Sequence, residues 1–166
     1  MNKESDYRIE EMSVTEWPAV RAIYVEGIAT GLATFETEAP DWQAWDENHL
    51  PVPRLVTRSG DRIAGWAALS PVSDRCVYGG VAEVSVYVAE AYRGRGLGKA
   101  LLKELIERSE DAGIWTLQAG IFPENKASIG VHLASGFRVV GIRERLGQLN
   151  GQWRDVALLE RRSEAI

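Results

Sequence analysis

The chain has 166 residues, of which 45% are hydrophobic and 26% charged, and its formal net charge is -5 at pH 7. This composition is ordinary for a soluble globular protein, and we expect residues 1–166 to form a single domain. The acidic balance argues against a nucleic-acid backbone as the main partner, and no apolar run approaches the roughly 18 residues of a membrane span.

Cysteine and histidine are scarce, which restricts the possible chemistry. Cys76 is the single cysteine, and His49 and His132 are the two histidines, so neither a disulfide framework nor a metal centre is expected. The N-terminal residues 1–6 are polar and acidic, unlike a signal or transit peptide. We therefore expect a cytoplasmic protein without metal, membrane or nucleic-acid partners.

The first half of the chain is predicted to contain one early strand, two helices and three further strands. Thr15 is the expected N-cap of the first helix, and Pro18 lies in its first turn, where a missing N–H costs nothing. The other predicted segments are a strand at 7–10, a helix at 42–49, a hairpin of strands at 55–58 and 63–69, and a strand at 81–88.

The second half begins with a glycine-rich stretch, 93–99, and a long amphipathic helix that ends at Gly113. The later segments are a strand at 116–122, a helix at 125–135 closed by Gly136, a strand at 137–142, a turn at Asn150-Gly151 and a strand at 156–159. This order predicts a mixed α/β sheet, because strands and helices do not alternate regularly.

The glycine-rich stretch Arg93-Gly94-Arg95-Gly96-Leu97-Gly98-Lys99 is the most informative segment. Alternate glycines let the main chain approach a ligand at the positive end of a helix, which suits a phosphate. It is not a Walker A loop, because Ala100 replaces the Ser or Thr that holds magnesium, and Lys99 replaces the third glycine of a Rossmann fingerprint. The alternative is an ordinary helix-start turn with solvated basic residues.

Together with three flanking features, this stretch resembles the acyl-CoA pyrophosphate loop of the GNAT N-acetyltransferases. The flanking features are Val86-Tyr87-Val88 before the loop, Asn125-x-x-Ser128 at the next helix start, and Gly136-Phe137 after that helix. The resemblance implies a GNAT fold, an α/β (α+β) architecture in which a mixed, mostly antiparallel sheet of about seven strands splays apart at the acetyl-CoA site, with about four flanking helices. It also implies acetyl-CoA as co-substrate.

The resemblance assigns the co-substrate to particular segments. Main-chain N–H groups from about 94 to 99 would hold the pyrophosphate, Val88 would pair with the pantetheine arm, and Asn125 would contact its far side. The implied cofactor-binding residues are Val86, Tyr87, Val88, Arg93, Gly94, Arg95, Gly96, Leu97, Gly98, Lys99, Asn125 and Ser128.

The strand at 81–88 carries polar side chains on one face, at Glu83, Ser85 and Tyr87. A carboxylate in a partly desolvated cleft can take the proton of an ammonium group, so Glu83 is the candidate general base. The alternative is a half-exposed strand whose polar face meets water.

His132 lies four residues before the Gly136-Phe137 pair, where GNAT enzymes commonly place a Tyr as the acid for the CoA thiolate. A His there, with Glu83 upstream, is similar to the phosphinothricin and methionine sulfoximine acetyltransferase branch, which implies catalytic roles for Glu83 and His132. The alternative for His132 is a packed helix histidine, and His49 is expected to be structural.

The segment 71–78 resembles the branch's substrate loop, which usually reads Pro-Trp-Arg-x-Arg-x-x-Tyr. Arg75 and Tyr78 match it, whereas Val72 and Ser73 depart from it and remove one potential anion partner. Arg75 is then the best-suited anion ligand, and the alternative is a surface arginine. The implied substrate-binding residues are Phe35, Glu36, Ser73, Asp74, Arg75, Tyr78, Ser85, Val86 and Tyr87.

The resemblance as a whole implies an acetyl-CoA-dependent N-acetyltransferase in which a neutral amine attacks the thioester directly. The implied acceptor is a small amino acid analogue such as methionine sulfoximine or phosphinothricin, which suggests detoxification. Two alternatives are a protein or peptide N-acetyltransferase and a non-catalytic CoA-binding module. A homodimer is expected, because the branch usually dimerises and six tryptophans exceed what one small core needs.

Overall fold

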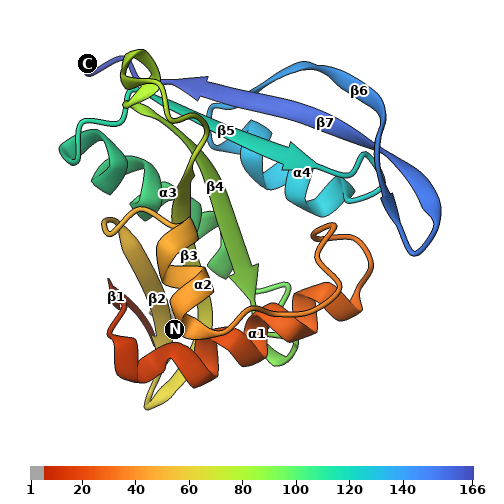
Figure 1. Cartoon of the computed structure of the whole chain (residues 1–166). Coiled ribbons are helices and arrows are strands. Elements are labelled where there is room, and N and C mark those ends of the chain that lie inside the picture. The colour runs from red at the N-terminus through yellow and green to blue at the C-terminus, as the bar shows by residue number, and fades with distance from the viewer. Residues whose placement is uncertain (1–5) are drawn as a thin grey trace.

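The computed structural model describes residues 6–166, so most of the predicted polar N-terminal segment, residues 1–5, lies outside the described residues. A mixed sheet runs through the fold (Figure 1). Its strands are β1 (Tyr7–Glu11), β2 (Arg54–Ser59), β3 (Arg62–Pro71), β4 (Val81–Val88), β5 (Thr116–Ile121), β6 (Arg138–Leu149) and β7 (Gln152–Arg162). Their spatial order is β1-β2-β3-β4-β5-β7-β6. Among the strands of residues 6–166 only β4 and β5 pair in parallel, so the predicted mixed and mostly antiparallel sheet is confirmed.

Helices cover both faces of this sheet. The α-helices are α1 (Trp17–Ala29), α2 (Trp42–Asn48), α3 (Leu97–Asp111) and α4 (Lys126–Ala134). Three short 3-10 helices are η1 (Val14–Glu16), η2 (Cys76–Tyr78) and η3 (Glu90–Tyr92). Within residues 6–166, none of the helices is both long and apolar enough to cross a membrane.

Alternation along β3 divides the interior into two cores. Ala67 and Leu69 point into the larger core, which includes the apolar face of α3. Trp66 and Ala68 point into a second core against α1 and α2, where Trp17 and Trp45 are also buried. Several tryptophans therefore fill the space between the sheet and the two N-terminal helices.

The first helix does not start as predicted. Ser13, rather than Thr15, caps the segment: its hydroxyl accepts the Thr15 N–H at 3.4 Å, while the Glu16 carboxylate accepts the Ser13 N–H at 3.2 Å. The prediction of Thr15 as N-cap was wrong, because the Ser13 and Glu16 pair satisfies two N–H groups reciprocally in a capping box. The turn that follows is η1, and α1 begins at Trp17.

The C-terminal hairpin has the predicted turn but longer strands. Asn150 and Gly151 have φ of 51° and 79°, the left-handed pair that a tight two-residue turn requires. Predicted strands at 137–142 and 156–159 extend to 12 and 11 residues because β7 pairs with β5 on one side and β6 on the other. β6 is consequently an outer strand of the sheet.

The sheet opens between β4 and β5. These strands pair only from Val81 to Glu83 on β4, opposite Thr116 to Gln118 on β5. Beyond that point β4 continues along β3 and β5 continues along β7, so the two strands diverge (Figure 1). The predicted splay is therefore present, and it lies beside the strand that leads into the glycine-rich loop.

Candidate active site

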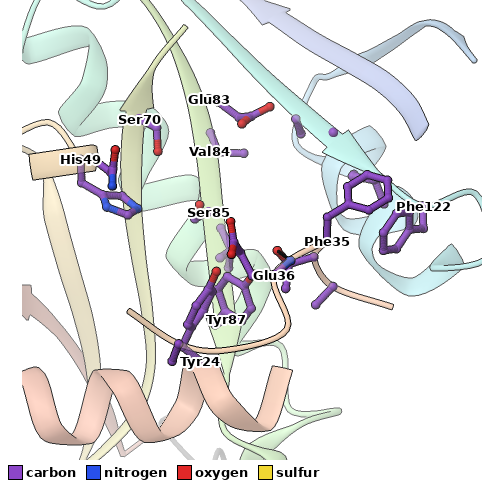
Figure 2. A pocket seen from close by; sticks show the side chains of 18 of the residues that line it. Tyr24, Phe35, Glu36, His49, Ser70, Glu83, Val84, Ser85, Tyr87 and Phe122 are labelled. Atoms are coloured by element: carbon purple, nitrogen blue, oxygen red, sulfur yellow. Dashed lines mark hydrogen bonds between the residues drawn. The ribbon is translucent and has the colours of Figure 1, made fainter. Parts of the chain in front are cut away.

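A cavity of about 940 Å³ lies at the opening between β4 and β5 (Figure 2). β4 lines it with residues 83–87, and residues 119–122 line it at the end of β5. The segment 31–40, which we call the strap, connects α1 to α2 and lines the cavity with its residues 33–40. α4 contributes His132.

The cavity brings together both predicted catalytic residues and about a third of the other predicted site residues. Those that line it are Glu83, His132, Phe35, Glu36, Ser85, Val86, Tyr87 and Asn125. The others lie outside its lining: Ser73, Asp74, Arg75, Tyr78, Val88, Arg93, Gly94, Arg95, Gly96, Leu97, Gly98, Lys99 and Ser128. In the 71–78 loop, Arg75 lies over the Tyr78 ring at 5.4 Å, and both side chains are exposed.

Glu83 occupies the last paired position of β4 before the strands diverge, opposite Gln118. Across the opening, the Glu83 carboxylate lies close to Gly120, where an added Cβ would be in ordinary van der Waals contact with Glu83 Oε1 at 3.6 Å. Burial raises the pKa of Glu83, and a hydrogen bond with Gln118 opposes that shift only partly. The result is a carboxylate that is more basic than usual, as a general base should be.

His132 is 5% exposed, and its Nδ1 lies 2.7 Å from the Ser128 carbonyl oxygen. Because a carbonyl only accepts, we infer that Nδ1 carries the proton and that Nε2 presents a lone pair. Burial lowers the pKa of His132, which favours the neutral ring at pH 7. Nε2 is buried without a hydrogen-bond partner in the described part of the chain. In this state His132 can accept a proton at Nε2 before it can donate one.

Sequence reasoning predicted Tyr87 as a site residue but missed Tyr24, which also lines the cavity. Tyr24 of α1 packs edge-to-face on Tyr87 at 5.0 Å, and both line the cavity. Gly27, one helical turn after Tyr24, permits this packing, because a Cβ there would lie 2.6 Å from the Tyr87 ring. In the sequence, Gly27 on the apolar face of the first helix was the signal that could have indicated a close contact at Tyr24. His49 also lines the cavity, stacked at 4.1 Å on Trp45, whose carbonyl bonds its Nδ1.

The open edge of β4 offers main-chain hydrogen-bonding groups. The Ala89 N–H donates to the Ala64 carbonyl of β3 at 2.8 Å. Because bonded pairs alternate in an antiparallel ladder, the main chains of Val86 and Val88 face away from β3, toward the opening. Arg93 Nε reaches the Val88 carbonyl at 3.2 Å, and β5 pairs with β4 only as far as Glu83. An extended ligand could pair with this edge in place of a strand.

The glycine-rich loop precedes α3 and has the geometry of an anion site. Gly94 and Gly96 have φ of 77° and 81°, and nothing lies within 4 Å of a Cβ at either position. For the N–H groups of residues 94–99, no hydrogen-bond acceptor is present among residues 6–166. These groups lie at the positive end of a 15-residue helix, so the loop fits a pyrophosphate.

Two predicted cofactor residues have local structural contacts as well. Asn125 caps α4, because its Oδ1 accepts the Ser128 N–H at 3.2 Å, and its Nδ2 donates to the Leu32 carbonyl of the strap at 3.2 Å. Arg95 donates to the Tyr7 hydroxyl at 3.0 Å, beside the Tyr92 ring. Asn125 therefore connects α4 to the strap across the cavity.

The family profile described as "Acetyltransferase (GNAT) family" matches residues 13–137, which include β4, the glycine-rich loop and His132. The chain belongs to the GNAT acetyltransferase family. It is an N-acetyltransferase, and its sheet and helices form the GNAT fold, as the sequence predicted. Among residues 6–166 no group of three His, Cys, Asp or Glu side chains could hold a metal ion.

Named relatives of this GNAT protein act on small molecules or on protein. The chain is 32% identical over 158 residues to the L-methionine sulfoximine/L-methionine sulfone acetyltransferase of Pseudomonas aeruginosa, with 92% of each chain covered. A phosphinothricin acetyltransferase from Sinorhizobium meliloti, solved with acetyl-CoA, superposes with TM-score 0.84 at 28% identity, covering 95% and 88% of the chains. A structure titled ribosomal-protein-alanine N-acetyltransferase, from Brucella melitensis, superposes with TM-score 0.87 at 31% identity, covering 94% and 99%.

The raised pKa of Glu83 predicts a pH-dependent cost in stability. A carboxyl whose pKa is higher folded than unfolded weakens folding once it ionises. We expect Glu83→Gln to have a higher free energy of unfolding than the wild type at pH 8. The difference should shrink as pH falls through the raised pKa toward the ordinary value of 4.5, and disappear below about pH 4.

Urea denaturation at pH 4 and pH 8 measures this effect. Glu107→Gln, which removes an exposed carboxylate of α3, controls for the change in net charge. Equal unfolding free energies for wild type and Glu83→Gln at both pH values would contradict the assignment of a desolvated carboxylate.

Proposed function

We propose that this N-acetyltransferase transfers the acetyl group of acetyl-CoA to the amino group of a small amino acid analogue of the methionine sulfoximine or phosphinothricin type. The observation that carries the proposal is Glu83, a desolvated carboxylate at the point where β4 and β5 diverge, in the same cavity as His132. The named relatives that act on such analogues support this acceptor class. Detoxification in the cytoplasm would be the corresponding role.

The residues present fit acetyl-CoA. The N–H groups of residues 94–99 would hold its pyrophosphate, and the outward main-chain groups of Val86 and Val88 would pair with the pantetheine arm. Arg93 and Lys99 would add positive charge beside the loop. The bound thioester supplies an electrophilic carbonyl carbon, and the Val88 N–H, which faces the opening, would polarise that carbonyl.

Proton transfer falls to Glu83 and His132. Glu83, directly or through water, takes one proton from the acceptor's ammonium group, which frees the nitrogen lone pair. As the new C–N bond forms and the C–S bond breaks, His132 Nε2 accepts the second amine proton and passes it to the departing sulfur. This order follows from the neutral ring, whose Nε2 must gain a proton before it can act as the predicted acid.

The peptide acceptor remains a second candidate because one superposing structure carries a ribosomal-protein-alanine N-acetyltransferase title. The strap favours the smaller acceptor. Phe35 packs on Phe122 at 4.9 Å and clusters with Leu149 and Val156, so the strap borders the cavity on the side of the C-terminal hairpin. A peptide that extends in this direction would need the contact to open.

An acceptor screen tests the proposed function. We expect CoA thiol release with L-methionine sulfoximine or phosphinothricin and not with an alanine-terminated peptide. Glu83→Gln should lower kcat by about 10²–10⁴ while acetyl-CoA still stabilises the protein thermally. No release with any small amine would overturn the acceptor class. Thermal stabilisation without turnover, unchanged in Glu83→Gln, would favour the CoA-binding module instead.

The pyrophosphate assignment is tested by two glycines at opposite ends of α3. Gly96 and Gly113 have φ of 81° and 82°, and neither has atoms within 4 Å of a Cβ, so alanine strains both by about 1–2 kcal/mol. We expect Gly96→Ala to weaken acetyl-CoA binding about tenfold by calorimetry and Gly113→Ala to leave it unchanged. Equal affinities in the two variants would contradict the assignment.

The exposed outer strand supports the expected homodimer. Val139, Val140, Ile142 and Leu146 of β6 and Trp153 of β7 are 43–55% exposed. Such an apolar edge is usually covered. Arg75 of the segment 71–78 is exposed and does not line the cavity of its own chain. In a dimer it could instead reach the cavity of the second copy.

We expect light scattering to show two chains per particle. Ile142→Lys should dissociate the dimer, whereas Val14→Lys, at an exposed apolar position of η1, should not. A wild-type monomer at tens of micromolar would contradict the homodimer.

A further inference from the structure

The charged side chains that line the cavity are all acidic. They are Glu36, Glu38 and Glu83, and no lysine or arginine of residues 6–166 joins them. The cavity's histidines, His49 and His132, have their pKa lowered by burial, which favours their neutral form at pH 7. An acceptor's own charges should therefore affect how well it binds.

Glu36 is held in a defined place by the strap. Its neighbour Phe35 packs on Phe122 and against Gly147, where a Cβ would lie 3.1 Å from the Phe35 ring. The Glu36 N–H donates to the Thr34 hydroxyl at 3.1 Å. In the strap, Phe35 therefore packs in an apolar contact, and Glu36 points toward the cavity (Figure 2).

The Glu36 carboxylate faces Tyr24 and Tyr87, and within residues 6–166 it has no cationic partner. Its charge contributes to the raised pKa of both phenols, after the larger effect of their burial. No ion pair of Glu36 occurs in the described part of the chain. The two arginines that contact the strap do not pair with Glu36. Arg21 donates to the carbonyls of Ala39 and Pro40, and Arg154 donates to the Gly31 carbonyl and pairs with the Glu124 carboxylate.

The spacing of side chains along β4 gives the distance from the proposed base, Glu83, to the end of the strand that Glu36 faces. Glu83, Ser85 and Tyr87 share one face of β4, so Ser85 and Tyr87 lie about 7 and 13 Å along the strand from Glu83. An acceptor whose amine is at Glu83 can extend its side chain along this face toward Ser85 and the end where Tyr87 faces Glu36 (Figure 2). The far end of a short amino acid side chain then enters the field of an unpaired carboxylate.

We propose that Glu36 is a specificity-determining residue that disfavours acceptors whose side chain ends in an anion and favours those that end in an uncharged oxygen group, such as a sulfone or sulfoximine. The inference rests on the proposed function, because it concerns the acceptor of that reaction. The α-carboxylate is common to both kinds of acceptor, so it cancels from their comparison. The selection acts by charge repulsion at the side-chain end rather than by a new contact.

The test compares L-methionine sulfone, with an uncharged side chain, and phosphinothricin, with an anionic phosphinate. The measured quantity is the ratio of their kcat/KM values. We expect the wild type to favour the sulfone and Glu36→Gln to lower that ratio about threefold to tenfold. Glu36→Asp, which keeps the charge, should retain most of the preference. Asp61→Asn, which removes a charge from the β2–β3 turn outside the cavity, should leave the ratio unchanged.

The salt dependence of the kcat/KM ratio is a second measurement, which a purely structural role of Glu36 would not affect. Because the screening length is about 30 Å at 0.01 M and about 3 Å at 1 M, the wild-type ratio should fall as salt rises. The Glu36→Gln ratio should change much less over the same range. Urea denaturation of both proteins shows whether the strap substitution affects folding.

The outcomes separate the two proposals. Release of thiol with neither acceptor overturns the proposed function. Turnover of both with a ratio that neither Glu36→Gln nor salt changes overturns the role of Glu36 alone. A wild type that prefers phosphinothricin, and loses that preference in Arg75→Gln, also overturns it, because a cation would then dominate the field at the acceptor's side-chain end.

Discussion

The three-residue pairing of β4 with β5 is the constraint on which the rest of the site depends. If that ladder continued, the main-chain groups of Val86 and Val88 would be used by a neighbouring strand. Because pairing ends at Glu83, the two strands follow different neighbours, β3 and β7. The gap leaves the β4 edge at Val86 and Val88 free to pair with an extended ligand, and it opens the cavity that Glu83 lines.

A divided sheet needs a connection across its opening, and the strap provides it. Its Gly31 and Leu32 carbonyls accept from Arg154 and Asn125, which belong to the C-terminal half of the fold. Arg154 also stacks over the Phe122 ring at 4.1 Å, beside Phe35. The segment between α1 and α2 therefore borders the cavity and is held there by residues far away in the sequence, so its position depends on α4 and the C-terminal hairpin.

The site is assembled at some cost to stability. Burial of the Glu83 carboxyl and the His132 ring disfavours the charged form of each, and His132 Nε2 has no partner among the described residues. Unpaired buried polar groups cost about 1–3 kcal/mol each. The two large apolar cores on either side of β3 and β4 offset such costs, so a reactive site can be placed where the pairing of β4 and β5 ends.

Local patterns in the sequence were sufficient for most of the fold and for the position of Glu83 on a polar strand face. Alternation along 81–88 predicted the polar face of β4 with Glu83, and the glycines of 93–99 predicted a helix start whose main chain a ligand can approach, since both depend on nearby residues. Local signals failed where two motifs competed, as at Ser13 and Thr15. What only the tertiary structure decided is which distant segments meet: Tyr24 and the strap border the cavity, while Arg75 lies outside its lining. Periodicity and spacing describe one element at a time, whereas the distance between elements depends on how their faces pack.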